Sequence, residues 1–264
     1  MLNYRKTAKR RTEDPSMTIR IEMLGTGSAF AKKYYNNNAL MTGGDYTLLV
    51  DCGITAPSAL HHMGVGLEKI DGIFISHTHA DHVGGLEEIA FRMKFEHERK
   101  PDLLVPAGIR RSLWEHTLRG GLESPEDGAD SLDAYFRVIE IPEETVHEVA
   151  PGFTIELFQT KHVPGKLSYC LIVNGGLLYT ADTRFDRGLI RYAYHERGCR
   201  HILHDCQLIT PGTVHATLEE LLTLPEDIQK SVLLMHYGDN MESFMGKTGR
   251  MTFMKQHKAY EFDV

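Results

Sequence analysis

Three histidines and one aspartate stand within six consecutive positions, at His77, His79, Asp81 and His82. They follow an apolar run, residues 70–75, that predicts a buried strand. Imidazole and carboxylate groups are typical zinc ligands, and loops at the carboxyl ends of strands build the sites of α/β folds. Any one of the 15 histidines taken alone is better explained as an exposed or hydrogen-bonded residue. The spacing H-x-H-x-D-H nevertheless predicts a metal site.

Three more candidate ligands stand close behind later predicted strands. His162 follows the run 153–158, Asp182 follows 177–179, and His236 follows 232–235. The order along the chain is therefore H-x-H-x-D-H, then H, then D, then H. These seven side chains are the candidate metal ligands of the chain.

The surrounding sequence predicts two groups of strands, each followed by helices. We expect helices at 57–63, 86–98, 109–118, 189–195 and 218–222. Further strands are expected at 19–24, 39–42, 46–50, 103–105, 136–139, 167–173 and 202–203. This pattern predicts an α/β fold with two mixed sheets face to face, helices outside, and a single domain over 17–264.

Composition and length exclude several classes of protein. The chain has 264 residues, 42% hydrophobic and 25% charged, as in ordinary globular proteins. Its longest apolar runs are too short to cross a bilayer, and its first residues have no secretory signal pattern. Four cysteines without a C-x-x-C pair indicate reduced thiols with packing roles. We therefore expect a cytoplasmic protein, in the host cytoplasm if its origin is viral.

The charge distribution indicates a small substrate. A net charge of −7 disfavours binding of long nucleic acids, which depends on many Lys and Arg contacts. A small anion held by a local positive site remains open. Residues 1–16 are basic, lack apolar periodicity and are expected to form a flexible tail.

Two loops could contact a ligand. In residues 32–38, Lys33, Tyr34 and Tyr35 combine positive charge with aromatic faces, so they could hold a phosphate and stack on a base. A plain solvated loop explains them equally well. Residues 120–133 are expected to form a long loop, serving as a lid or a partner contact or simply lacking order.

The ordered set of metal motifs resembles the metallo-β-lactamase superfamily, whose fold is an αββα sandwich. The resemblance implies that His77, His79 and His162 hold one metal, and that Asp81, His82 and His236 hold the other. Asp182 would bridge the two. The ligand types suit two zinc ions per chain, with manganese or iron as alternatives.

Two further segments resemble the tRNase Z branch of this superfamily. They are residues 204–207 and 215–217. In the motifs that they resemble, a histidine oriented by an acidic residue attends the leaving group. The resemblance assigns His215, held by Asp205, as the donor of a proton to a departing alkoxide, and we count Asp81 with them as catalytic. The alternative is that His215 merely flanks a helix beginning near Thr217. His204 is expected to lie buried behind the ligands. The long tRNA-gripping arm is missing, since 19 residues separate His162 from Asp182.

The segment 25–36, together with these motifs, is most similar to the anti-Pycsar proteins of phages and bacteria. The resemblance implies a homodimeric phosphodiesterase that opens cyclic CMP and cyclic UMP, with cyclic AMP and cyclic GMP as an open extension. Ser28 joins Lys33, Tyr34 and Tyr35 as an expected substrate contact. The alternatives are a tRNase Z-type RNA 3′-end endonuclease and a non-catalytic protein that sequesters a nucleotide. Hydrolysis of a lactone or a cyclic phosphonate also stays open.

Overall fold

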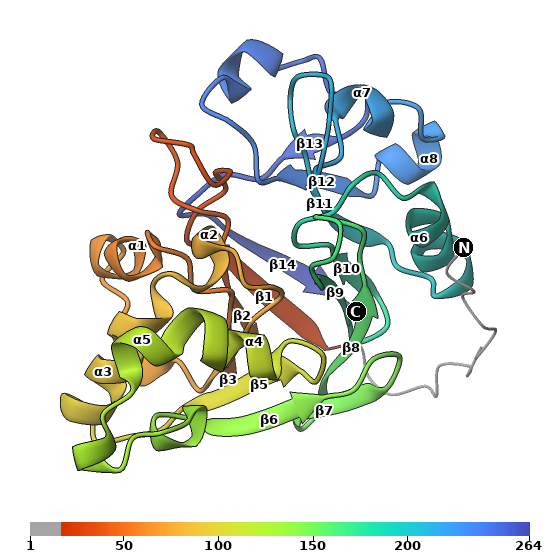
Figure 1. Cartoon of the computed structure of the whole chain (residues 1–264). Coiled ribbons are helices and arrows are strands. Elements are labelled where there is room, and N and C mark those ends of the chain that lie inside the picture. Colours follow the sequence, from red (N-terminus) through yellow and green to blue (C-terminus); the bar gives the residue numbers. More distant parts are fainter. Residues whose placement is uncertain (1–16) are drawn as a thin grey trace.

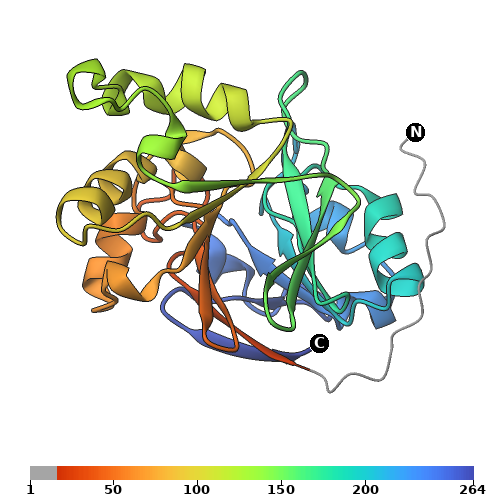
Figure 2. The ribbon, with the colours of Figure 1, turned by 90° about the horizontal axis from the view of Figure 1, so that it is seen from below.

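The computed structural model describes residues 17–264, and the predicted basic tail, residues 1–16, lies outside the described residues. Two seven-stranded sheets face each other, and helices cover their outer faces (Figures 1 and 2). Both sheets mix parallel and antiparallel neighbours. The predicted α/β class and the sandwich of two mixed sheets are therefore confirmed.

The first sheet is antiparallel on one side and parallel on the other. Its order is β14-β1-β2-β3-β4-β5-β6. Antiparallel pairing joins β14 through to β3, and parallel pairing joins β3 through to β6. The strands are β1 Thr18–Met23, β2 Ala39–Gly43, β3 Tyr46–Val50, β4 Gly72–Phe74, β5 Asp102–Pro106, β6 Arg137–Ile141 and β14 Ala259–Asp263.

The second sheet repeats this arrangement. Its order is β13-β12-β11-β10-β9-β8-β7, with antiparallel pairs from β7 to β10 and parallel pairs from β10 to β13. The strands are β7 Val146–Ala150, β8 Phe153–Gln159, β9 Tyr169–Val173, β10 Leu177–Tyr179, β11 His201–Asp205, β12 Val232–Met235 and β13 Thr252–Phe253.

The helices are short and flank the sheets (Figure 2). The α-helices are α1 Ala56–His62, α2 Ala80–Val83, α3 Leu86–Phe95, α4 Arg110–Leu113, α5 Arg119–Leu122, α6 Arg187–Arg191, α7 Leu218–Leu221 and α8 Glu226–Gln229. The π-helices are Trp114–Leu118 and Tyr192–Glu196, and 3₁₀ turns are Leu67–Lys69, Pro125–Asp127, Leu132–Ala134 and Met241–Phe244. Among the described residues, no helix is long and apolar enough to span a bilayer.

The inner strands β9 and β10 of the second sheet are buried on both faces. In β9, Leu171 and Val173 belong to the cluster shared with the first sheet, whereas Cys170 and Ile172 face the outer helices with Leu189 and its neighbours. Alternate residues therefore pack against different layers, as in any strand. This explains why the strand sequences are continuously apolar.

One prediction is wrong in part. Gly120 and Gly121 do not begin a long loop but lie in α5, which continues the helix that starts at α4. Leu118 and Leu122 lie one turn apart on the same face, and both side chains are buried, so this helical turn packs against the core. The rest of the segment is packed as well, since two 3₁₀ turns bring Ala129 and Leu132 into the core.

Candidate metal centre

The strand ends bring the seven predicted ligands together. β4 leads into the segment that carries His77, His79, Asp81 and His82, the last two within α2. The other ligands follow strands of the second sheet: His162 after β8, Asp182 after β10 and His236 after β12. Their ligand atoms form two groups, each within 4.8 Å, and Asp182 belongs to both.

The first group places three imidazole nitrogens around one point. Nδ1 of His79 lies 3.0 Å from Nε2 of His77 and 3.1 Å from Nε2 of His162. Oδ2 of Asp182 lies 3.8 and 3.7 Å from the same two Nε2 atoms. One ring nitrogen cannot donate to two partners at once, so a shared cation accounts for this convergence better than hydrogen bonds do.

The second group faces the other oxygen of Asp182. Its Oδ1 lies 3.3 Å from Nε2 of His82 and 3.4 Å from Nε2 of His236. Oδ2 of Asp81 lies 3.2 and 3.3 Å from these nitrogens. Asp182 thus offers one oxygen to each group, which is the geometry of a bridging carboxylate.

Hydrogen bonds from behind aim the rings at the centre. Nδ1 of His82 donates to Oδ2 of Asp51 at 2.7 Å, and Nδ1 of His162 donates to the carbonyl of Val214 at 2.8 Å. Both rings therefore point Nε2 inward, as metal-binding histidines do. Nε2 of His82 and Oδ1 of Asp182 are buried without a hydrogen-bond partner in the described part of the chain. A cation would satisfy both atoms.

Asp51 was not predicted, although it organises both groups. It follows β3 with a positive φ of 61°. Besides His82, its carboxylate accepts hydrogen bonds from the backbone N–H and the Oγ of Ser76 at 2.7 and 2.8 Å. That Oγ lies 3.0 Å from Nδ1 of His77. Its position directly after a strand, like that of the ligands, was the available signal.

Gly53 lets this segment approach α2. A Cβ at Gly53 would lie 1.9 Å from the carbonyl oxygen of Asp81, so only glycine fits. Asn38 joins the two sides, because its Oδ1 accepts from Gly53 N at 2.9 Å and its Nδ2 donates to Asp81 O at 3.3 Å. The backbone that carries Asp81 is therefore held by tight packing.

The two ligand groups differ in the protonation of their histidines. Burial lowers the pKa of His77 well below 6.5 and that of His79 to about 4, so both rings are neutral. Burial alone would raise the pKa of Asp182, but His236, His82 and His77 hold it well below its usual range. Burial would lower the pKa of His82 and of His236, but Asp182 and the neighbouring carboxylates raise both well above 6.5, so these two rings would release a proton when a cation binds.

His215 stands beside the second group in the arrangement that the sequence predicted. Its Nδ1 lies 2.8 Å from Oδ2 of Asp205, and its ring stacks on His236 with centroids 4.8 Å apart. Burial would lower the pKa of His215, but the charge and hydrogen bond of Asp205 raise it above 6.5. His204 is buried, as expected, and donates from Nδ1 to the Asp205 carbonyl.

The backbone fixes His215 and Asp205 relative to the ligands. Asp205 also accepts from Thr183 N at 3.0 Å, directly after Asp182. Ala216 N donates to the Thr183 carbonyl at 2.8 Å. Thr217 caps α7 through a capping box with Glu220, so the helix has its own cap and does not need His215.

The predicted substrate contacts lie in the loop between β1 and β2. Ser28 N donates to the Tyr237 carbonyl at 3.0 Å, next to His236. The rings of Tyr34 and Tyr237 meet edge to face, and Tyr35 packs against His257. Lys33 pairs with Glu242 at 3.2 Å. The structure therefore engages Lys33 and both tyrosines with other residues of the protein.

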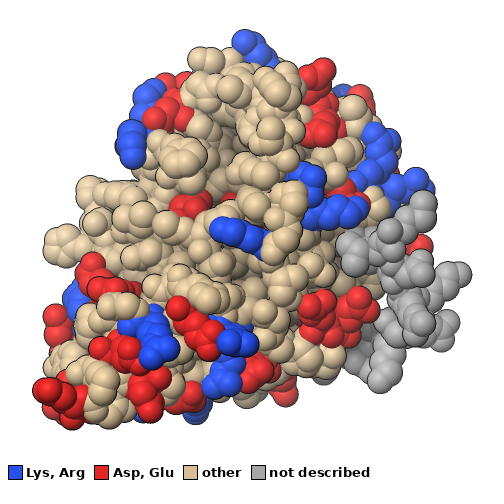
Figure 3. Space-filling view, viewed as in Figure 1, with Lys and Arg blue, Asp and Glu red and all other residues tan. Residues whose placement is uncertain are grey.

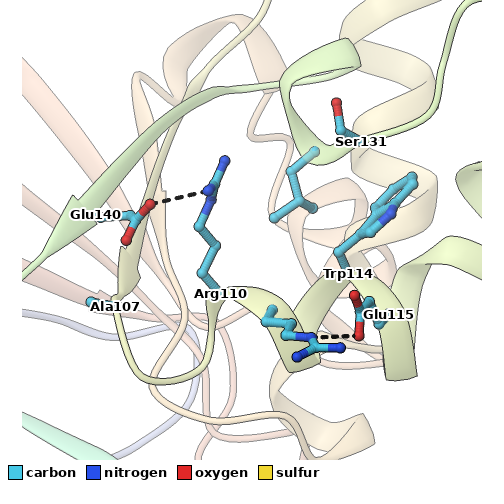
Figure 4. Close-up of a pocket in the computed structure, with 8 residues that line it drawn as sticks. Ala107, Arg110, Trp114, Glu115, Ser131 and Glu140 are labelled. Carbon is cyan, nitrogen blue, oxygen red and sulfur yellow. Dashed lines mark hydrogen bonds and ion pairs between the residues drawn. The ribbon is translucent and has the colours of Figure 1, made fainter.

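A separate pocket of about 370 Å³ contains none of the metal-competent residues. Trp114, Ser131 and Leu132 line it, and its charges are paired internally (Figure 4). Arg110 lies 3.1 Å from Glu140, and Arg111 lies 2.8 Å from Glu115. These pairs leave no free charge in the pocket for a phosphate.

Solved structures with this fold share little sequence with the chain. A diphosphatase from the PhnP family aligns with a TM-score of 0.76 at 16% identity, covering 94% of this chain and 98% of its own. The metallo-β-lactamase fold protein YhfI from Bacillus subtilis gives 0.72 at 20% identity, covering 93% and 100%. Human tRNase Z, short form, gives 0.66 at 16% identity, with coverage of 93% and 100%. These likenesses establish the metallo-β-lactamase fold.

Sequence comparison identifies the family. The family model described as Anti-Pycsar protein Apyc1 matches residues 19–260. A protein of that name from Paenibacillus xerothermodurans is 53% identical over 93% of this chain and 98% of its own length. Another, from Bacillus phage BSP38, is 48% identical over 92% and 98%. With the fold and the histidine and aspartate clusters suited to metal ions, the chain belongs to the Anti-Pycsar Apyc1 family of metallo-β-lactamase-fold proteins.

Proposed function

We propose that this protein is a metal-dependent phosphodiesterase that hydrolyses cyclic mononucleotides to linear nucleotides. Cyclic CMP and cyclic UMP are the proposed substrates, with cyclic AMP and cyclic GMP as further ones. The observation that carries the proposal is the pair of ligand groups sharing Asp182, with His215 and Asp205 beside them, in a chain of the Anti-Pycsar family.

The donor set fits two zinc ions, with manganese as an alternative. His77, His79 and His162 would hold one ion, Asp81, His82 and His236 the other, and Asp182 both. Two such ions, when bound, supply an activated water and stabilise the charge on the phosphoryl oxygens. Asp81 thereby contributes to catalysis as a ligand.

His215 is the proposed general acid. Opening a cyclic phosphodiester expels a ribose alkoxide, which leaves readily only when it receives a proton. Asp205 holds Nδ1 of His215 and favours the charged ring, since its charge and hydrogen bond raise the pKa of His215. That leaves Nε2 to deliver the proton to the departing oxygen.

The charge of the molecule supports a small anionic substrate. Two divalent ions would outweigh Asp81 and Asp182, so the centre attracts an anion. Acidic and basic side chains are interspersed on the face in Figure 3, without a broad basic surface that would follow a long nucleic acid. We further propose a cytoplasmic homodimer, in keeping with the family resemblance.

The test is a panel of substrates for the zinc-loaded protein. We expect linear monophosphates from cyclic CMP and cyclic UMP. We expect no cleavage of precursor tRNA at physiological salt, because the 19 residues between His162 and Asp182 form the β9–β10 hairpin in place of a tRNA-gripping arm. If all four cyclic nucleotides stayed intact, the substrate assignment would be wrong. Recovery of unmodified nucleotide from a stable complex would instead indicate a sequestering protein.

A further inference from the structure

One aromatic side chain in the loop between β1 and β2 is exposed and has no evident role in the fold. Phe30 lies in the loop that projects beyond the ends of β1 and β2 (Figure 1), and it is 88% exposed, more than any other large apolar residue described. Water contact with so much apolar surface is unfavourable. An unpacked phenylalanine on a well-anchored loop therefore suggests a ligand contact.

The loop is anchored on the near side of Phe30 to the strand that delivers His236. Gly27 forms an isolated parallel β-bridge with Tyr237, and Ser28 N donates to the Tyr237 carbonyl at 3.0 Å. A Cβ at Gly27 would lie 2.7 Å from the Tyr34 carbonyl oxygen, so glycine permits this close crossing. The turn at Phe30 is then closed by Ala31 N, which donates to Ser28 O at 3.1 Å.

The far side is anchored to the same segment. The carboxylate of Asp239 accepts from Lys32 N at 2.9 Å and from Lys33 N at 2.8 Å. Phe30 therefore stands between two fixed points, both attached within three residues of His236. Since two residues span at most about 7 Å, the backbone of Phe30 stays close to Ser28, whose N–H is bonded to the residue after His236.

The other aromatic residues of the loop are already in contact with protein. Tyr34 meets Tyr237 with ring centroids 5.1 Å apart, and Tyr35 meets His257 at 5.6 Å. Phe30 has no ring contact among the described residues. It is the aromatic face that this loop leaves open.

We propose that Phe30 stacks on the nucleobase of the substrate while the metal centre acts on its phosphate. This inference rests on the proposed cyclic-nucleotide function and assigns the base contact to Phe30. Stacking of a base on an aromatic ring is sequence-tolerant, because every base has a π-face. Phe30 would thus set the affinity for nucleosides over base-free esters and admit both pyrimidines and purines.

The experiment compares wild type with Phe30→Ala, Phe30→Trp and the matched control Phe95→Ala. Phe95 is a second exposed phenylalanine, 65% accessible, at the far end of α3. For each zinc-loaded protein, calorimetry gives the Kd for CMP and AMP. Kinetics give kcat and KM for cyclic CMP, cyclic AMP and a base-free ribose cyclic phosphate.

We expect Phe30→Ala to raise both the Kd for nucleotides and the KM for cyclic nucleotides about tenfold, with kcat nearly unchanged. The base-free ester should be unaffected, Phe30→Trp should bind as tightly as wild type, and Phe95→Ala should match wild type throughout. Unchanged Kd and KM in Phe30→Ala, or an equal loss for the base-free ester, would overturn the stacking role while the hydrolase remained. If the wild type cleaved no cyclic nucleotide while Phe30→Ala bound CMP more weakly than the wild type, the proposed function would be rejected and the stacking role would stand.

Discussion

The carboxylate of Asp51 lies 2.7 Å from Nδ1 of His82 and also accepts two hydrogen bonds from Ser76. Through Ser76 Oγ, which lies 3.0 Å from Nδ1 of His77, it reaches the other ligand group. One buried side chain thus orients a histidine in each half of the centre. The arrangement explains why Asp51 tolerates a left-handed backbone conformation with φ of 61°.

Asp51→Asn should weaken metal binding about 10- to 100-fold, because the amide no longer provides the negative charge that supports His82 and fixes its tautomer. Asparagine tolerates positive φ, so the backbone is preserved. Competition titration against a chelator measures the change. Asp45→Asn, at an exposed turn, is the control. Equal affinity in the two variants would show that Asp51 does not support the centre.

His215→Ala should slow hydrolysis of cyclic CMP about 100-fold or more, without loss of metal, because a general acid is removed. A phosphodiester with a nitrophenolate leaving group needs no proton and should lose much less. His195→Ala, an exposed histidine on the π-helix after α6, should behave as wild type. Reduced metal content in His215→Ala would instead assign His215 a ligand role.

Metal removal should lower thermal stability. An ion that binds only the folded chain contributes about 2.7 kcal/mol at 100 times its Kd, which corresponds to a fall in Tm of about 5 to 10 °C after stripping. Without cations, Oδ1 of Asp182 and Nε2 of His82 are buried with no hydrogen-bond partner in the described part of the chain. Calorimetric scans before and after chelation, and after zinc is restored, measure this. An unchanged Tm would mean that the clusters hold no structural cation.

The thiols should be unreactive in the folded protein. Burial raises the pKa of Cys170 and of Cys199 to about 12. It also raises the pKa of Cys52 and of Cys206, and all four thiols are buried. A raised thiol pKa leaves almost no thiolate at pH 7 to 9, and burial blocks the reagent, so labelling of the native protein should stay slow across this range. In guanidinium, all four should react. Rapid labelling of one thiol in native protein would contradict the buried packing.

Much of the centre could be predicted from the sequence because its ligands follow apolar strands closely. The strand ends determine where His162, Asp182 and His236 lie, and histidine and aspartate are residue types that bind metal ions. The pairing of His215 with Asp205 was also predicted, but from the resemblance of their two motifs to the tRNase Z branch, and the structure places the two side chains in contact.

Other features depended on contacts that no local pattern reveals. β7 is an exposed edge strand, and β13 has only two residues, so neither has a clear alternating apolar pattern. The loop chemistry of residues 32–38 suggested Tyr34 and Tyr35 as stacking residues, but only the fold shows that Tyr237 and His257 contact them. Asp51 is ordinary in sequence, and its function depends on packing against α2.

The most direct test of the proposed two-cation centre is a zinc titration of metal-stripped protein, with bound metal and cyclic CMP turnover measured on the same samples. We predict that turnover is absent without metal and reaches its maximum at two zinc ions per chain. Full turnover in metal-free protein, or no zinc bound at concentrations that saturate the activity, would contradict the account.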